Sequence, residues 1–120
     1  METYIRLRCN QAPELVEIDP KKLLDGFYQA LDCDCIETVH IRNGYLLILD
    51  EVGKLRNKEY NQVASTLYDS GYTADWIAGD ALIARIGFRD DETDIVPLGK
   101  HETELMLAKL KTLWAKANPP

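Results

Sequence analysis

The sequence predicts an α+β fold, a mainly antiparallel sheet with about three helices packed on one face, in the order ββαββαββα. Three observations carry this prediction: period-two alternation near the N-terminus, an Asn-Gly turn between two apolar segments, and apolar residues at helical spacing in three segments. With 120 residues, of which 46% are hydrophobic, the chain has the length and composition of one globular domain, so residues 1–120 are expected to form a single α+β domain. Such a sheet leaves its second face to solvent or to a partner.

Period-two alternation predicts the first strand. Residues 2–9 alternate between an apolar side and a side that carries Arg6 and Arg8, which is typical of a half-buried strand. A return strand is expected at 15–18 after a turn. Two later segments are apolar enough to be strands, one at 76–88 with a break or bulge at Gly79-Asp80 and one at 95–98.

The strongest local signal is a β-hairpin in the middle of the chain. The apolar segments 35–41 and 45–49 flank Asn43-Gly44. Asn and Gly tolerate the two positive φ angles of a type I′ turn, so a tight hairpin is expected. The second arm is apolar on both sides, which places it in the centre of the sheet.

Helical spacing of apolar residues predicts three helices, at 20–31, from about Glu59 to Gly71, and at 101–117. Asp19-Pro20 is a typical start for the first, because an Asp side chain caps a helix and Pro fits its first turn. Gly71 is expected to end the second.

The charge of the chain limits its partners. Twenty acidic against fourteen basic residues give a net charge of −6, which argues against nucleic-acid binding because that function usually shows a basic excess. Spread over the surface, this charge is about tenfold less dense than that of duplex DNA. The local run Asp90, Asp91, Glu92 and Asp94 is dense enough for a DNA-like or protein-docking patch, or it is a solvated loop.

The expected location is a reducing cytoplasm. No apolar stretch approaches the ~20 residues of a membrane span, and the first ten residues lack the apolar core of a signal peptide. The three cysteines are an odd number, and Cys33 and Cys35 are too close in sequence for an ordinary disulfide framework.

Catalytic and metal-binding motifs are not found in the sequence. Cys33, Cys35 and His40 are close together but lack the spacing of zinc ligands, and Leu105 stands where a zincin helix beginning at His101 needs its second histidine. No serine lies in a G-x-S-x-G frame, and the glycines are scattered at turns. We therefore expect no enzymatic activity, no cofactor and no metal.

Basic residues offer a possible binding surface. Arg6 and Arg8 share one side of the first strand, and Lys54, Arg56 and Lys58 recur at every second position near an aromatic residue. Basic and aromatic groups together can hold a nucleotide or another anion. They can equally be solvent-facing residues that protect sheet edges from aggregation.

The order of several short motifs resembles a known family. The hairpin is followed by Asp50–Leu55 (DEVGKL), Asn61 comes seven residues after Lys54, Asp75–Gly79 (DWIAG) leads into an apolar strand, and 95–98 (IVPL) precedes the last helix. This order resembles a domain-of-unknown-function family of small proteins carried by phages and conjugative elements of Firmicutes. The resemblance implies an accessory protein of a mobile element, with no reaction attached.

The resemblance also implies a site, in which the loop with Lys54 and Asn61 faces the segment Asp75–Gly79. Family members usually have a Gly-Leu-Pro-Pro stretch before the asparagine, whereas this chain has Asn-Lys-Glu-Tyr, which allows a helix to begin earlier. A purely structural interpretation is that Gly53 and Gly79 serve backbone geometry and that Asn61 caps a helix.

We therefore expect a non-enzymatic binding protein that acts by protein–protein contact, with a homodimer through the open sheet face or edge as one form of contact. A binder of a small anionic or nucleotide ligand is the first alternative. An acidic DNA mimic that inhibits a host nuclease through the 90–94 run is the second. The candidate binding residues are Lys54, Arg56, Asn61, Asp75, Gly79, Arg6 and Arg8.

Overall fold

The computed structural model describes residues 1–68 and 75–119, and within them the predicted α+β class and the order ββαββαββα are confirmed. The strands are β1 (Glu2–Leu7), β2 (Glu14–Ile18), β3 (Ile36–His40), β4 (Tyr45–Asp50), β5 (Ala81–Arg89) and β6 (Glu92–Val96). The helices are α1 (Leu23–Leu31), α2 (Gln62–Tyr68) and α3 (Lys100–Ala117), with one-turn 3₁₀ segments at η1 (Pro20–Lys22) and η2 (Arg42–Gly44).

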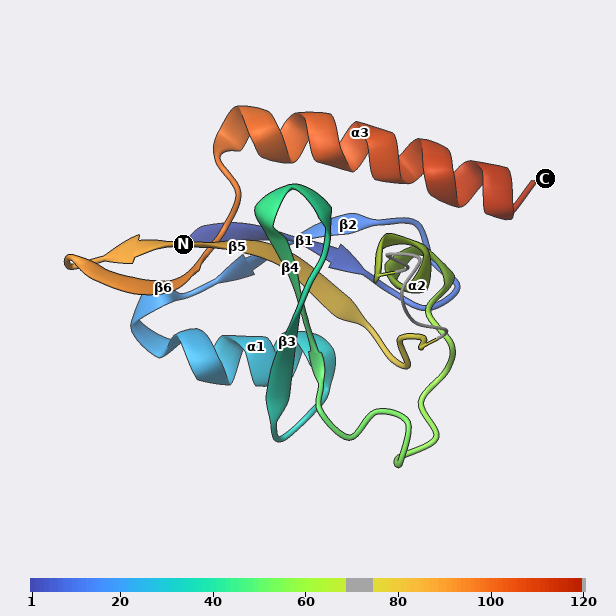
Figure 1. The fold of residues 1–120 in the computed structure, drawn as a ribbon, viewed down its shortest axis with the longest axis horizontal. Coiled ribbons are helices and arrows are strands. Elements are labelled where there is room, and N and C mark those ends of the chain that lie inside the picture. The colour runs from blue at the N-terminus through green and yellow to red at the C-terminus, as the bar shows by residue number, and fades with distance from the viewer. Residues whose placement is uncertain (69–74, 120) are drawn as a thin grey trace.

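The strands form one antiparallel sheet in the order β2-β1-β5-β4-β3, and β6 pairs with the outer part of β5 (Figure 1). In β4, the five residues Leu46–Asp50 are all buried. The expected central place of the second hairpin arm is confirmed, because β4 lies between β3 and β5.

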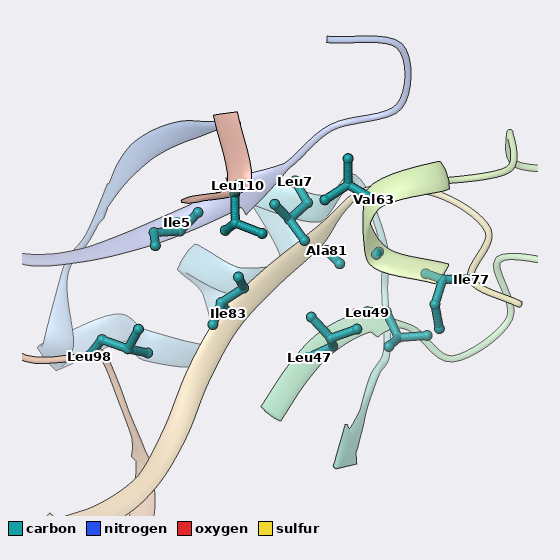
Figure 2. Packing of buried hydrophobic residues seen from close by; sticks show 11 residues of the cluster. Ile5, Leu7, Leu47, Leu49, Val63, Ile77, Ala81, Ile83, Leu98 and Leu110 are labelled. Carbon is teal, nitrogen blue, oxygen red and sulfur yellow. The ribbon is translucent and has the colours of Figure 1, made fainter. Parts of the chain in front are cut away.

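The helices cover both faces of the sheet, and here the predicted packing on one face is wrong. Figure 1 shows α1 on one side of the sheet and α3 on the other. Phe27 and Leu31 of α1 pack on Ile48 and Leu82, whereas α2 and α3 pack on the alternate residues of the same strands. Figure 2 shows this second cluster, which contains Ile5, Leu7, Leu47, Leu49, Val63, Ile77, Ala81, Ile83, Leu98 and Leu110.

The physical reason lies in the central strands themselves. β4 and the first half of β5 are apolar on both sides, so leaving either face in water would expose large apolar side chains. The face that was expected to be open for a homodimer is therefore covered by α1.

The hairpin turn has the predicted geometry. Asn43 and Gly44 both have positive φ angles, 65° and 79°, and the Tyr45 N–H donates to the Arg42 carbonyl. These features define a type I′ turn.

Several element boundaries differ from the prediction, and in two of them side chains or turns interrupt the pattern. Helix α2 begins at Gln62 and not near Glu59, because Asn61 caps it; its predicted end at Gly71 lies outside the described residues. Strand β6 begins at Glu92, three residues earlier than expected. Asp90 and Asp91 both take positive φ angles (49° and 66°) and form a tight turn that joins it to β5. Most of the polar connector is therefore part of a β-hairpin.

Strand β5 also begins later than the apolar pattern suggests. Residues 76–80 are irregular, apart from an isolated bridge between Tyr60 and Ala78. Within residues 1–68 and 75–119, no helix combines the length and the apolar character needed to cross a membrane.

Candidate functional site

The candidate site is the loop of residues 51–60 between β4 and α2, and Asn61 fixes its end. Asn61 is 1% exposed. Its side-chain Nδ2 donates to the carbonyl oxygens of Leu7 and Gly79, each at 2.9 Å, and its Oδ1 accepts from the Ala64 N–H at 3.0 Å. Its backbone N–H donates to the Ile77 carbonyl at 2.9 Å. Asn61 thus caps α2 and ties together β1, α2 and the segment before β5, which is a structural position.

Two glycines let the loop touch the segment before β5 at backbone level. A Cβ on Gly53 would lie 2.7 Å from the Ala78 carbonyl oxygen, closer than any side chain tolerates. Gly79 has φ +87°, and its N–H donates to the Glu59 carbonyl at 2.7 Å. The two segments that the motif order singles out therefore lie against each other in the structure.

A buried carboxylate anchors the other end of the loop. Asp50 is 2% exposed, and the Lys58 ammonium lies 2.8 Å from its Oδ2. Lys58 also donates to two carbonyl oxygens at the C-terminal end of α1, at 3.0 and 2.6 Å. Burial alone would raise the pKa of Asp50, but hydrogen bonds from Lys58 and the Val52 N–H outweigh it and hold this pKa below its ordinary value.

Lys58 was noted only as one of the recurring basic residues and Asp50 only as the start of a motif, and the pairing of the two was not predicted. A carboxylate at the end of an apolar strand, followed eight positions later by a lysine, was the available signal. That signal is weak, because sequence spacing does not tell which lysine reaches back to the carboxylate.

An exposed cluster of Lys54, Leu55, Tyr60 and Trp76, here called the aromatic patch, lies on the outer surface of the loop. The Tyr60 and Trp76 ring centroids are 5.8 Å apart, and the Lys54 ammonium lies 4.8 Å from the Trp76 ring centroid. Leu55 is 84%, Tyr60 54% and Trp76 40% exposed. Next to the patch is a cleft of about 360 Å³, lined in part by Lys54, Leu55 and Trp76.

Asp75 holds Lys54 in place over the tryptophan. Its carboxylate is hydrogen-bonded to the Lys54 ammonium and accepts from the Trp76 N–H at 2.9 Å. The hydrogen bond from Lys54, with that from the Trp76 N–H, lowers the pKa of Asp75. The carboxylate therefore stays ionised at neutral pH and orients both neighbours.

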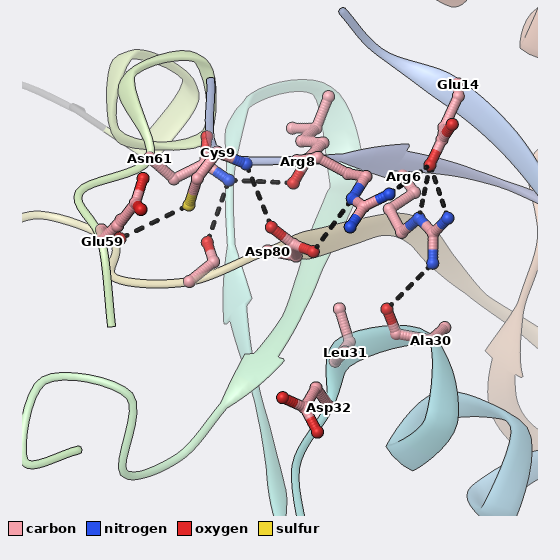
Figure 3. A network of polar contacts seen from close by, with 12 residues as sticks. Arg6, Arg8, Cys9, Glu14, Ala30, Leu31, Asp32, Glu59, Asn61 and Asp80 are labelled. Atoms are coloured by element: carbon pink, nitrogen blue, oxygen red, sulfur yellow. Dashed lines mark hydrogen bonds and ion pairs between the residues drawn. The ribbon is translucent and has the colours of Figure 1, made fainter. Parts of the chain in front are cut away.

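Arg6 in β1 and Arg8, which follows the end of β1 because the strand stops at Leu7, are both bound by acidic neighbours (Figure 3). Arg6 donates from Nε to Glu14 at 2.8 Å and from Nη1 to the Ala30 carbonyl at 3.1 Å. Arg8 lies 3.4 Å from the Asp80 carboxylate. These contacts join β1 to β2, to α1 and to the segment before β5.

The remaining basic residue of the prediction, Arg56, lies 3.4 Å from the Asp50 carboxylate. A cleft of about 470 Å³ separates it from Arg8, and three carboxylates as well as three cations line this cleft. The acids are Asp32, Glu59 and Asp80. An anionic ligand would have to compete with these carboxylates.

The remaining titratable groups of interest are the cysteines, the histidines and the carboxylates outside the loop. In the part of the chain that the structure describes, no three His, Cys, Asp or Glu side chains gather as a metal site requires. Burial, assisted by Asp80 and Glu59, raises the pKa of the Cys9 thiol to about 11, and burial also raises the pKa of Cys33. A protonated thiol is a poor nucleophile at neutral pH.

The carboxylates of the acidic run occupy different places on the β5–β6 hairpin. Asp90 and Asp91 form its turn, and Asp94 lies 3.2 Å from the Arg89 guanidinium. Arg89 also binds Glu2 at the start of β1. The run is thus partly neutralised by a cation of the same hairpin.

The class defined by this architecture is a small antiparallel sheet covered by helices on both faces, in which the 51–60 loop and the segment before β5 together present the aromatic patch. The family described as Domain of unknown function (DUF3846) matches residues 2–111, and the chain belongs to this family. Membership of a family of unknown function, predicted from the order of the motifs, is thereby confirmed. No curated protein and no solved structure matched the chain.

Proposed function

We propose that this protein is a non-enzymatic accessory protein of a phage or conjugative element, and that it acts by protein–protein contact through the aromatic patch. The observation that carries the binding role is the exposed Tyr60–Trp76 pair beside Leu55 and Lys54. The mobile-element context rests only on the resemblance of the motif order to a family carried by phages and conjugative elements.

The composition of the aromatic patch suits a protein interface. Tryptophan and tyrosine are enriched among the residues that contribute most to binding, because they bury a large area with few rotatable bonds. Leu55 and Trp76 border a cleft that a partner side chain can fill. Lys54 and Asp75 supply a charged pair at its rim.

The base of the aromatic patch is rigid. Asn61 fixes one end of the loop through buried hydrogen bonds, and the ion pair of Lys58 with Asp50 fixes the other. Gly53 and Gly79 keep the loop in backbone contact with the segment that carries Trp76. A patch held in this way loses little conformational freedom on binding, which favours affinity.

The two alternative functions have less support. A nucleotide binder needs cations available for phosphate, but Arg6, Arg8, Lys54 and Arg56 each have a carboxylate within 3.4 Å. A DNA mimic needs a dense acidic face, and Arg89 neutralises part of the 90–94 run. A thermal-shift screen with nucleotides tests the first alternative, because a ligand at 100 times its Kd adds about 2.7 kcal/mol of stability.

The test of the proposed function compares variants that each lack one exposed aromatic side chain. Wild-type protein, Trp76→Ala, Tyr60→Ala and the control Phe88→Ala are immobilised, and a lysate of the host bacterium is passed over each at physiological salt. Phe88 is 77% exposed on the distant β5–β6 hairpin, so it controls for loss of an exposed aromatic ring. Bound proteins are quantified by mass spectrometry.

We expect a specific protein to be retained by wild type and by Phe88→Ala and depleted on both patch variants. A residue that dominates an interface contributes 2 kcal/mol or more, so the affinity of the purified partner should fall by about 30-fold or more in Trp76→Ala. Equal retention on all four proteins, or no specific protein on any of them, would count against the proposal.

A further inference from the structure

A second surface of the molecule is an apolar groove with a basic rim. The groove has a volume of about 600 Å³ and lies between α3, α2 and the β3–β4 turn. Figure 1 shows α3 lying across this end of the sheet, with the β3–β4 hairpin and α2 beneath it. The apolar lining comes from the three elements together and consists of Ile41, Tyr45, Leu67, Met106, Leu110 and Leu113.

The lining is accessible although it continues the hydrophobic core. Leu110 is buried, whereas Leu67, Met106 and Leu113 are partly exposed and pack against the core from outside. On one wall the Tyr45 hydroxyl donates to the Glu102 carboxylate at 2.8 Å, which fixes the hairpin to the first turn of α3. This bond links two of the elements that border the groove.

Three cations stand on the rim, namely Arg42, Lys109 and Lys116, and all three are exposed. Among residues 1–68 and 75–119, no carboxylate oxygen lies within ion-pair distance of any of them. By contrast, the basic residues around the 51–60 loop are paired with acids. In a chain of net charge −6, a group of unneutralised cations around an apolar groove gives a local potential that attracts an acidic ligand.

We propose that this groove binds an acidic amphipathic helix of a partner protein, whose apolar side chains enter the groove while its carboxylates pair with the rim. Lys109 and Lys116 are two helical turns apart, about 10 Å along α3, with Leu110 and Leu113 between them. A helix laid along α3 matches that spacing with acidic residues two turns apart.

The groove shares no residue with the aromatic patch, so the inference is independent of the proposed function. Within the described chain, the β5–β6 hairpin also combines an exposed apolar side chain, Phe88, with nearby acidic residues, Asp90 and Asp91. That segment is a hairpin and not a helix. Binding of a second copy is therefore an outcome that the test must distinguish.

The test uses a fluorescein-labelled synthetic helical peptide with a leucine stripe and glutamates two turns apart on its flank, and a twin peptide with lysines in place of the glutamates. Fluorescence anisotropy measures binding to wild type, to Lys109→Glu/Lys116→Glu and to the control Lys100→Glu/Lys111→Glu. The control carries the same change in net charge on exposed residues of α3 that do not line the groove. Circular dichroism confirms that each variant is folded.

We expect wild type and the control to bind the glutamate peptide, and the rim variant to bind it at least tenfold more weakly while it gains affinity for the lysine peptide. Trp76→Ala should bind the glutamate peptide as wild type does. Equal losses in both double variants, equal binding of the two peptides, or no binding would overturn the proposal. So would concentration-dependent self-association that is lost in the rim variant and restored by Asp90→Lys/Asp91→Lys, because the occupant would then be a second copy.

Discussion

Replacement of Asn61 by alanine is the perturbation with the clearest consequence for stability. The side chain is 1% exposed and takes part in three hydrogen bonds, two as donor to the Leu7 and Gly79 carbonyls and one as acceptor from the Ala64 N–H. In Asn61→Ala all three backbone groups lose their side-chain partner. The end of β1, the start of α2 and the segment before β5 are then no longer joined at this point.

The expected loss in the free energy of unfolding is the sum of three contributions. Loss of a helix N-cap costs about 1 kcal/mol. Each of the two buried carbonyl groups left without its partner costs about 1 kcal/mol at the lower end of the usual range, since a carbonyl has a second lone pair. The free energy of unfolding should therefore fall by about 3 kcal/mol. With a urea dependence of about 1.5 kcal/mol per M, the midpoint moves down by about 2 M.

Urea unfolding followed by circular dichroism at 222 nm measures this loss. The matched control is Asn118→Ala, because Asn118 is exposed and its single side-chain bond, to the Trp114 carbonyl, lies at the end of α3. The control should lose less than about 0.5 kcal/mol. If Asn61→Ala unfolds within 1 kcal/mol of wild type, the hydrogen-bond argument is refuted.

A charged isostere at the same position adds a pH dependence. In Asn61→Asp a buried carboxylate would face the two carbonyl oxygens, so burial and repulsion raise its folded pKa above the unfolded value of about 3.9. The protonated acid can still donate one hydrogen bond. The loss of stability relative to wild type should therefore be smallest below pH ~4 and grow as the pH rises, and the same unfolding experiment repeated across pH checks this sign.

Three further perturbations test the loop and the wall of the groove by the same unfolding assay. Lys58→Met leaves the Asp50 carboxylate buried without its lysine and should lower the free energy of unfolding by about 3 kcal/mol at pH 7. In wild type the pKa of Asp50 is lowered in the folded state, so this carboxylate should stabilise the fold above pH ~4, and that stabilisation should be lost as the pH falls through the folded pKa. Gly79→Ala should cost about 1–2 kcal/mol because φ is +87°, whereas Gly99→Ala should cost less, because Gly99 has a negative φ and a Cβ there meets open space. Tyr45→Phe removes the bond to the Glu102 carboxylate and should cost about 1.5 kcal/mol; an unchanged midpoint would show that this bond does not hold the wall.

Sequence patterns found the loop of the candidate site but not the way it is built. The family resemblance implied that the loop with Lys54 and Asn61 faces the 75–79 segment, and the two parts do lie against each other. The sequence did not show that Trp76 is exposed beside Tyr60, since an apolar segment before a strand is more often buried. It also missed the Lys58–Asp50 pair, because that contact depends on how the loop folds back on α1.

The groove was missed for a related reason. Met106, Leu110 and Leu113 form an apolar stripe on α3, and such a stripe is normally assigned to the core. Only the position of α3 relative to the β3–β4 turn leaves part of the stripe open. Arg42 lines the same groove, although its turn precedes these α3 residues by more than sixty positions in the sequence.

The sequence by itself determined the local structure of this protein. Asn43-Gly44 specified the hairpin turn, Asp19 the start of the first helical segment, and Asn61 the cap of α2, because each acts through bonds to its own neighbours in the chain. Only the tertiary structure decided that α1 covers the opposite face of the sheet from α2 and α3. Tertiary packing also decided which basic residues are paired with acidic residues and which ones surround the apolar groove. These features arise from contacts between segments far apart in sequence, and periodicity along the chain carries no information about them.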